Sequence, residues 1–119
     1  MVMKYALLLL GLVFSLSACS QKTSNSSQEL YKVENFTVSG NCGMCKKTIE
    51  TAALSVKGVS KASWDVDTHI MTVFYNTDKV TLAQIQQKIA AAGYDNDGQR
   101  GNDTAYAKLP ACCHYERRQ

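Results

Sequence analysis

The sequence predicts a small α+β domain in which two helices cover one face of a four-stranded antiparallel sheet. Residues 61–76 alternate apolar and polar side chains on either side of a polar turn, which is typical of an antiparallel hairpin. A segment before the hairpin and another after it instead repeat their apolar residues at helical spacing. We therefore expect the order strand, helix, strand, strand, helix, strand, which is the split βαβ or ferredoxin-like arrangement.

The first strand and the first helix flank a cysteine-containing loop. Residues 31–38 are rich in β-forming residues, and Phe36 and Val38 fall on one face of the expected strand. After the loop, apolar residues recur at i, i+3, i+4 and i+7, which predicts one buried stripe of a helix: Ile49, Ala52, Ala53 and Val56. Gly58 is expected to end this helix.

The hairpin and the second helix complete the expected fold. The residues Asp67-Thr68-His69 predict the hairpin turn, and Thr81 with Gln84 forms the pattern of a capping box at a helix start. The second helix turns four apolar residues inward: Leu82, Ile85, Ile89 and Ala92. Gly93 is expected to stop it, and residues 94–97 are expected to form a short fourth strand.

Length and charge restrict the chain to one small domain without a nucleic-acid role. The 119 residues carry a formal charge of +3, and the basic residues are scattered rather than clustered. Neither histidine is linked in sequence to a nucleophile and an orienting acid. We therefore predict that the protein is not an enzyme.

The first 30 residues predict an export signal and a tether. Lys4 precedes a short apolar run, and residues 16–19 read Leu-Ser-Ala-Cys, which resembles the bacterial lipoprotein signal. That resemblance implies that residues 1–19 are the signal, with Cys19 lipidated, so that the protein is exported and anchored to a membrane facing the periplasm or the cell surface. Residues 20–30 are polar and predict a flexible tether to a domain at 31–98.

The motif Cys42-Gly43-Met44-Cys45 is the strongest chemical signal in the sequence. Two thiols at this spacing point at one atom when the first lies in a loop and the second opens a helix. The positive end of that helix favours the thiolate, which both binds soft metals and attacks disulfides. The motif alone therefore leaves a metal site and a redox site as alternatives.

The residues around this motif resemble those of the heavy-metal-associated domain family. The likeness rests on residues 38–45, Ile49-Glu50, Gly58-Val59, Tyr75 and Ala92-Gly93-Tyr94, and it covers residues 31–97. It implies that Cys42 and Cys45 bind a soft metal ion, copper(I) or mercury(II), and that Tyr94 lies in a loop flanking the site. It also implies that the ion is passed to a metal-transporting membrane protein.

Met44 and His69 are two further candidate ligands near the motif. The family usually places Gly-Met-x before its first cysteine, whereas this chain has Ser39-Gly40-Asn41 there and a methionine at position 44. Met44 is either a third soft ligand or, as an unbranched side chain beside a core, packs inward, and we favour inward packing. His69 in the hairpin turn is expected to be solvated rather than a ligand.

The extension at 99–119 adds a second group of soft ligands. Residues 103–109 are expected to form a short helix capped by Asp103 and ended by Pro110, and Cys112-Cys113-His114 follow. These three residues either complete the metal site, form a separate site, or contain cysteines that are oxidised in an exported protein. A completed site would suit zinc or a thiolate-rich copper(I) site, and zinc is the preferred ion if the extension contributes ligands, because zinc favours four of them.

The function that these patterns favour is membrane-tethered binding and transfer of a soft metal ion. A thiol-disulfide oxidoreductase is the first alternative, although the only proline, Pro110, lies in the extension. The second alternative is a structural domain stapled by a disulfide or by zinc.

Overall fold

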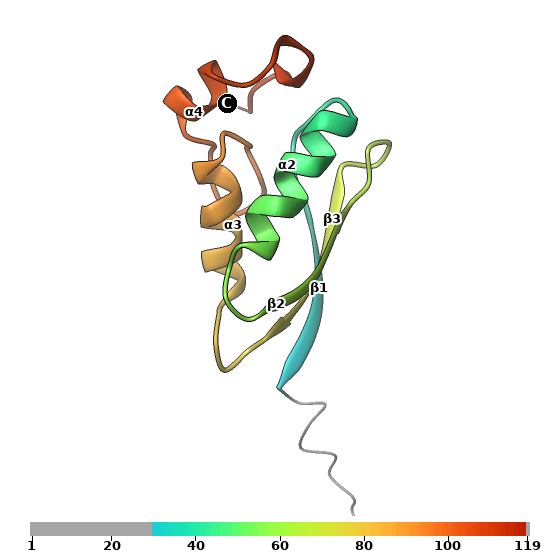
Figure 1. The fold of residues 1–119 in the computed structure, drawn as a ribbon, viewed down its shortest axis with the longest axis vertical. Coiled ribbons are helices and arrows are strands. Elements are labelled where there is room, and N and C mark those ends of the chain that lie inside the picture. Colours follow the sequence, from blue (N-terminus) through green and yellow to red (C-terminus); the bar gives the residue numbers. More distant parts are fainter. Residues whose placement is uncertain (1–29, 119) are drawn as a thin grey trace, which may run out of the picture.

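The computed structural model describes residues 30–118, and its regular elements follow the predicted order as far as the second helix (Figure 1). The predicted signal, Cys19 and the tether up to residue 29 lie outside the described residues. No helix among residues 30–118 is long and apolar enough to cross a membrane.

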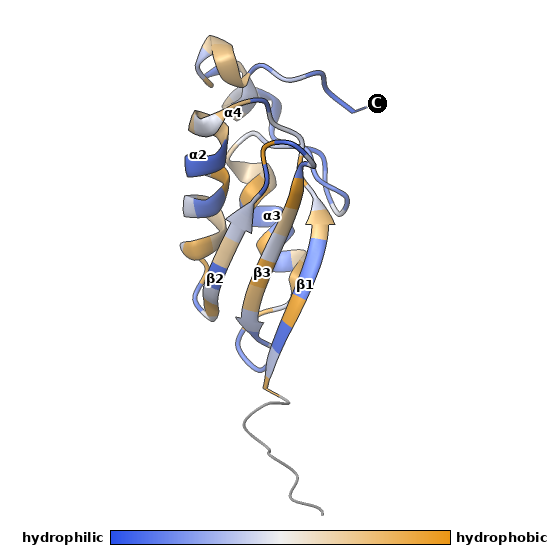
Figure 2. Cartoon of the chain, turned by 90° about the vertical axis from the view of Figure 1, so that its right-hand side faces the viewer, coloured by the Kyte–Doolittle hydropathy of each residue, from blue (hydrophilic) through white to orange (hydrophobic). Residues whose placement is uncertain are grey.

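The sheet has three antiparallel strands in the order β1-β3-β2. They are β1 (Tyr31–Thr37), β2 (Val59–Trp64) and β3 (Ile70–Asn76). Met71 at the start of β3 pairs with Phe36 on one side and with Trp64 on the other, so three large apolar residues lie in one row of the sheet. The predicted hairpin is confirmed, and Figure 2 shows the three strands side by side with the helices behind them.

Two helices cover the same face of this sheet, as predicted (Figure 1). Helix α2 (Gly43–Leu54) follows the cysteine loop, and helix α3 (Leu82–Ala91) begins at the predicted capping box. The backbone N–H of Gln84 donates to Thr81 Oγ1 at 3.3 Å, and the backbone N–H of Thr81 donates to Gln84 Oε1 at 3.0 Å. These reciprocal bonds satisfy two donors that the helix start would otherwise leave unpaired.

The predicted fourth strand is wrong. In residues 94–97 the only ladder contacts are isolated bridges from Asn96 to Val38 and to Gln99. The Asn96 side chain donates to the backbone oxygen of Gln86 at 3.0 Å and accepts from the backbone of Gly98 at 3.0 Å. Side chains of Asn and Asp that bond nearby backbone in this way compete with a ladder, so the segment forms a turn beside β1.

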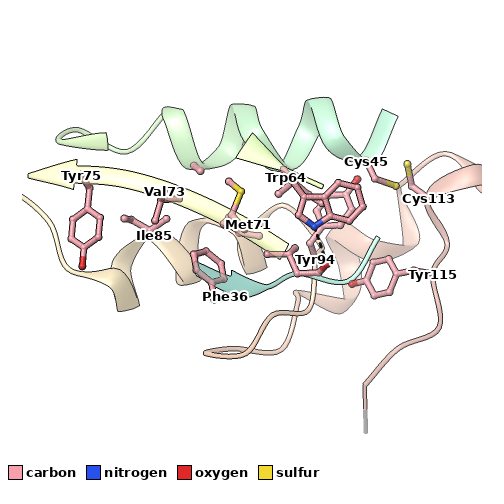
Figure 3. Close-up of a cluster of buried hydrophobic side chains, with 14 of the residues drawn as sticks. Phe36, Cys45, Trp64, Met71, Val73, Tyr75, Ile85, Tyr94, Cys113 and Tyr115 are labelled. Atoms are coloured by element: carbon pink, nitrogen blue, oxygen red, sulfur yellow. Dashed lines mark hydrogen bonds between the residues drawn. The ribbon is translucent and has the colours of Figure 1, made fainter. Parts of the chain in front are cut away.

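The apolar core lies between the sheet and the two helices and reaches the cysteine loop at one end (Figure 3). Trp64 is fully buried there, and its Nε1 donates to the backbone oxygen of Val38 at 3.0 Å. Gly40 packs against the indole: a Cβ atom at this position would lie 2.9 Å from Trp64 Cη2 and 3.3 Å from Cys45 Cβ. The loop therefore approaches the core so closely that only glycine fits at position 40 without displacing the indole.

The extension forms two short helical turns, α4 (Asp103–Ala107) and η1 (Ala111–Cys113). The predicted short helix is present, but its cap is Asn102 rather than Asp103. Asn102 Oδ1 accepts from the backbone N–H of Ala105 at 2.9 Å, and Asp103 is the first helical residue. In Figure 1 this extension lies over the end of the domain at which α2 begins.

Candidate metal centre

The extension brings its two cysteines, Cys112 and Cys113, close to Cys42 and Cys45, which we call the loop pair. Cys42 Sγ lies 3.6 Å from Cys45 Sγ, 3.3 Å from Cys112 Sγ and 3.7 Å from Cys113 Sγ. Cys112 Sγ and Cys113 Sγ are 3.9 Å apart, and Met44 Sδ lies 3.6 Å from Cys112 Sγ. All four cysteines are free thiols. Cys42 is therefore the centre of a cluster of sulfur atoms that come from the cysteine loop and from the extension.

The start of α2 holds the loop pair in place. Cys42 is the residue before the first helical turn and has an extended backbone, with φ of −144° and ψ of 177°, so its side chain stands outside the helix. Its carbonyl accepts from the backbone N–H of Lys46 at 3.0 Å, and the backbone N–H of Asn41 donates to Cys45 Sγ at 3.5 Å. The reversal of the chain between loop and helix thus points both thiols to one side.

The surroundings of Cys42 favour its thiolate. A hydrogen bond from the backbone N–H of Cys45, followed by contact with the Cys112 thiol, lowers the pKa of Cys42 to about 6. Contact with Cys42 and partial desolvation raise the pKa of Cys112. Because thiolates and not thiols bind metal ions, the lowered pKa makes Cys42 a candidate metal ligand at neutral pH.

Two of the thiols face the protein interior. Cys45 and Cys113 are both fully buried, and their side chains lie next to each other in Figure 3. Burial, with the neighbouring Cys45 thiol, raises the pKa of Cys113. Burial, with the Cys113 thiol, also raises the pKa of Tyr94, whose hydroxyl is buried without a hydrogen-bond partner in the structure. The Tyr94 hydroxyl is therefore free to donate a hydrogen bond to a metal-bound thiolate beside it.

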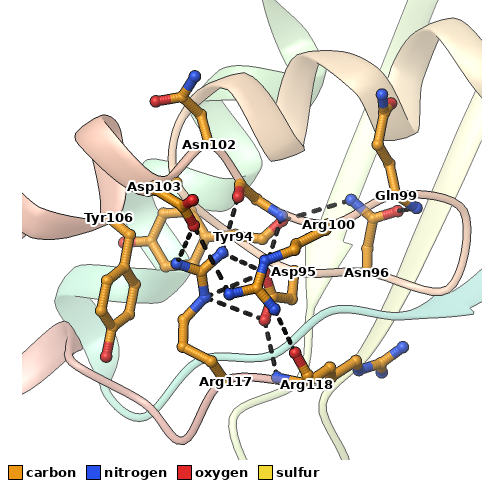
Figure 4. Close-up of polar contacts among 12 residues, drawn as sticks. Tyr94, Asp95, Asn96, Gln99, Arg100, Asn102, Asp103, Tyr106, Arg117 and Arg118 are labelled. Atoms are coloured by element: carbon orange, nitrogen blue, oxygen red, sulfur yellow. Dashed lines mark hydrogen bonds and ion pairs between the residues drawn. The ribbon is translucent and has the colours of Figure 1, made fainter.

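A buried ion pair ties the end of the chain to the domain (Figure 4). Asp95 is fully buried, and Arg117 donates to it from Nη2 at 2.9 Å and from Nε at 3.1 Å. The backbone N–H groups of Gly101 and Arg118 donate to the same carboxylate at 2.7 and 2.9 Å. Burial raises the pKa of Asp95, but these hydrogen bonds outweigh burial and hold the pKa below its usual value.

Aromatic residues fix the extension between this ion pair and the cysteines. Tyr115 is buried, and its hydroxyl donates to the backbone oxygen of Gly93 at 2.6 Å and accepts from the backbone N–H of Asp95 at 2.8 Å. Tyr106 donates to the backbone oxygen of Tyr115 at 2.8 Å, and the Arg117 guanidinium lies 4.5 Å from the centre of the Tyr106 ring. The chain from Cys113 to Arg117 is thus held at several points.

The structure brings some of the candidate ligands together and separates others. Cys42, Cys112 and Cys113 form one set whose sulfur atoms all lie within 4.8 Å of one another. Cys45 contacts Cys42 but is not a member of that set. His114 is also outside it and stacks on Tyr106 with ring centres 5.0 Å apart, and His69 stacks on Trp64 at 5.5 Å.

Met44 does not pack inward as expected. Its side chain is 55% exposed, and its sulfur faces Cys112. Tyr94 flanks the site, but from beneath it, as part of the core. Asp95, Arg117 and Tyr115 carry no recognisable sequence signal for their role, because a buried ion pair between residues 22 positions apart leaves no pattern in the sequence.

The spacing of the sulfur atoms fits an ion bound by several thiolates. At a metal–sulfur bond of about 2.3 Å, two sulfurs on one ion are about 4.6 Å apart in a linear site, about 4.0 Å apart in a trigonal site and about 3.8 Å apart in a tetrahedral site. The separations of 3.3, 3.7 and 3.9 Å within the mutual set are closest to the last two values. The Cys42–Cys45 separation of 3.6 Å is likewise too short for a linear two-coordinate ion.

Known proteins match the domain but not the whole extension. The heavy-metal-associated domain family matches residues 35–95. The copper chaperone CopZ of Staphylococcus aureus strain JH9 is 33% identical over 69 residues, which cover 58% of this chain and 96% of that protein.

Solved structures of similar proteins share the fold. A CopZ metallochaperone matches with a TM-score of 0.53 and 32% identity over 55% of this chain and 98% of its own. Oxidized MerP from Ralstonia metallidurans CH34 matches with a TM-score of 0.54 and 26% identity, over 56% of this chain and 94% of its own. A copper-binding domain from HMA7, a P-type ATPase, matches with a TM-score of 0.53 and 27% identity, over 55% of this chain and 89% of its own.

The family match ends at Asp95, so the cysteines at 112 and 113 lie beyond it. The match includes the loop pair, the helix that presents it and the hairpin behind it. The family match and the fold together show that this chain belongs to the heavy-metal-associated domain family.

Proposed function

We propose that this protein binds copper(I) through the thiolates of Cys42, Cys45, Cys112 and Cys113 and passes it to a partner. The observation that carries this proposal is the position of Cys42 Sγ, which lies between 3.3 and 3.7 Å from each of the other three thiols. An all-sulfur donor set selects soft ions. The similarity to a copper chaperone supports copper among them.

The geometry of the cluster favours copper(I) over zinc. Structural zinc takes four ligands in a tetrahedron. Among residues 30–118, Cys42, Cys112 and Cys113 lie mutually within 4.8 Å and Cys45 lies outside that set, so the four thiolates do not all surround one point. Mercury(II) also prefers thiolates, and the similarity to MerP makes it the second ion to test.

The exposed side of the cluster suits transfer to another protein. Cys112 is exposed and Cys42 is half-buried, so thiolates of a partner can approach the ion from this side. The partner that we propose is a metal-transporting membrane protein, which is supported by the similarity to a copper-binding domain of a P-type ATPase. The two thiols of the extension would slow this exchange, because a partner must displace more ligands.

Anaerobic titration with copper(I) against a chromophoric chelator tests the proposal. Cys42→Ser/Cys45→Ser is expected to lose tight binding, and Cys112→Ser/Cys113→Ser to bind more weakly than the parent. Cys19→Ser makes the same substitution at the remaining cysteine and is expected to match the parent. Tight binding that survives in Cys42→Ser/Cys45→Ser would contradict the proposal.

The lowered pKa of Cys42 also supports thiol-disulfide exchange as a second candidate function. A thiol whose pKa lies near ambient pH is well suited to attack a disulfide. Reduction of insulin by the metal-free protein, measured against Cys42→Ser, tests it. We expect no turnover above the Cys42→Ser background if copper binding is the function.

We further propose that the protein is an exported lipoprotein anchored through Cys19. The support is the Leu-Ser-Ala-Cys sequence at residues 16–19 after an apolar run. Metabolic labelling with a palmitate analogue should modify the parent and leave Cys19→Ser unlabelled. Equal labelling of both proteins would refute the anchor.

A further inference from the structure

The sulfur cluster is longer than one metal ion can span. Its atoms form a connected chain from Cys45 through Cys42 to Cys112 and on to Met44, with successive separations of 3.6, 3.3 and 3.6 Å. Two sulfurs bound to the same ion can be no more than about 4.6 Å apart at a bond length of about 2.3 Å. Cys45 lies outside the mutual set of Cys42, Cys112 and Cys113. One ion therefore leaves part of the cluster unused.

The two ends of this chain have different surroundings. At the inner end Cys45 and Cys113 are fully buried and lie next to each other (Figure 3). At the outer end Cys112 is exposed, and Met44 is 55% exposed on the first turn of α2. Cys42 contacts thiols of both ends, at 3.6 Å from Cys45, 3.3 Å from Cys112 and 3.7 Å from Cys113, which is the position expected of a shared ligand.

Met44 stands out from the other exposed apolar residues because of the atom that it faces. Single apolar side chains on a surface are common and need no function. The Met44 thioether, however, lies 3.6 Å from the Cys112 thiol, and thioether and thiolate together select copper(I). An unbranched side chain can also adjust its sulfur to an incoming ion without moving the backbone.

We propose that the cluster holds two copper(I) ions that share the Cys42 thiolate. The inner ion is bound by Cys42, Cys45 and Cys113, and the outer ion by Cys42, Cys112 and Met44. The outer ion exchanges faster, because one of its ligands is a neutral thioether and its side chains are exposed. This inference rests on the proposed function and adds a second, labile site to it.

Native mass spectrometry and anaerobic titration with copper(I) against a chromophoric chelator test the second site. The parent is expected to bind two equivalents, the second with lower affinity. Met44→Leu keeps the size and apolar character of the side chain and removes only the sulfur, and it is expected to lose the second equivalent while keeping the first. Cys112→Ser is expected to lose the second equivalent as well.

Met71→Leu is the matched control. It makes the same substitution at a methionine that is fully buried in the core, and it is expected to bind two equivalents like the parent. A parent that binds a single equivalent, or a Met44→Leu variant that binds two with the parent's affinities, would overturn the second site. A parent that binds no copper(I) would instead refute the proposed function itself, so the two failures are distinguishable.

Discussion

The buried ion pair between Asp95 and Arg117 should decide whether the extension stays on the proposed metal site. Arg117→Gln removes the guanidinium and leaves a fully buried carboxylate with only its two backbone donors. Removing one partner of a buried pair costs about 3 to 5 kcal/mol, and the remaining donors place this case near the lower value. At about 1.4 kcal/mol for each factor of ten, the population with a detached extension should rise roughly 100-fold.

Labelling of Cys113 in the metal-free protein measures this detachment. Cys113 is fully buried when the extension is packed against the domain, so its reaction with iodoacetamide reports how often the extension detaches. A Cys112→Ser background assigns the label to one position by mass spectrometry. Fluorescence of Trp64, the single tryptophan, reports whether the rest of the domain stays folded.

Arg118→Gln is the control for this experiment. Arg118 pairs with Asp97 at 2.9 Å, but the two side chains are 38% and 49% exposed. Such a pair contributes about 0 to 1 kcal/mol, so labelling should change by less than about 5-fold. Labelling of Cys113 at the parent rate in Arg117→Gln, or equal acceleration in both variants, would refute a role of the ion pair in holding the extension.

Three further predictions concern the loop and the ion pair. Gly40→Ala should lower the free energy of unfolding in urea by about 1 to 3 kcal/mol, because the added Cβ would lie 2.9 Å from the Trp64 indole; an unchanged midpoint would contradict this contact. Asp95 has a lowered pKa in the folded protein, so its stabilising effect is complete above its unfolded pKa of about 3.9 and is lost as the pH falls through the lower folded value. Asp95→Asn should therefore be less stable than the parent at pH 7, and thermal melts should show the difference shrinking below about pH 4; a constant difference would argue against it. Alkylation of Cys42 in the metal-free protein should rise with pH around a midpoint of about 6, whereas a midpoint near 9 would exclude the contacts assigned to this thiol.

Regular elements with a repeating pattern were predictable from the sequence. The alternation in residues 61–76 and the capping box at Thr81 depend on side chains a few positions apart, and both are confirmed. The fourth strand was not predictable in this way. Asp95 and Asn96 use their side chains to bind backbone groups of other segments, and only the folded chain brings those groups near.

The sequence nominates the residues of the proposed metal site but does not predict their arrangement. Soft side chains mark Cys42, Cys45, Cys112 and Cys113 as candidates wherever they lie in the sequence. The extension that carries two of them is paired to the domain through Arg117, a residue type that is common on surfaces and that gives no sign of a buried partner.

X-ray absorption spectroscopy of the protein carrying one equivalent of copper(I) tests most directly whether loop and extension form one site. It counts the sulfur atoms bound to the ion. We expect three sulfur ligands in the parent and two in Cys112→Ser/Cys113→Ser. Two sulfur ligands in both proteins would show that the extension does not bind the metal and would contradict the proposed function.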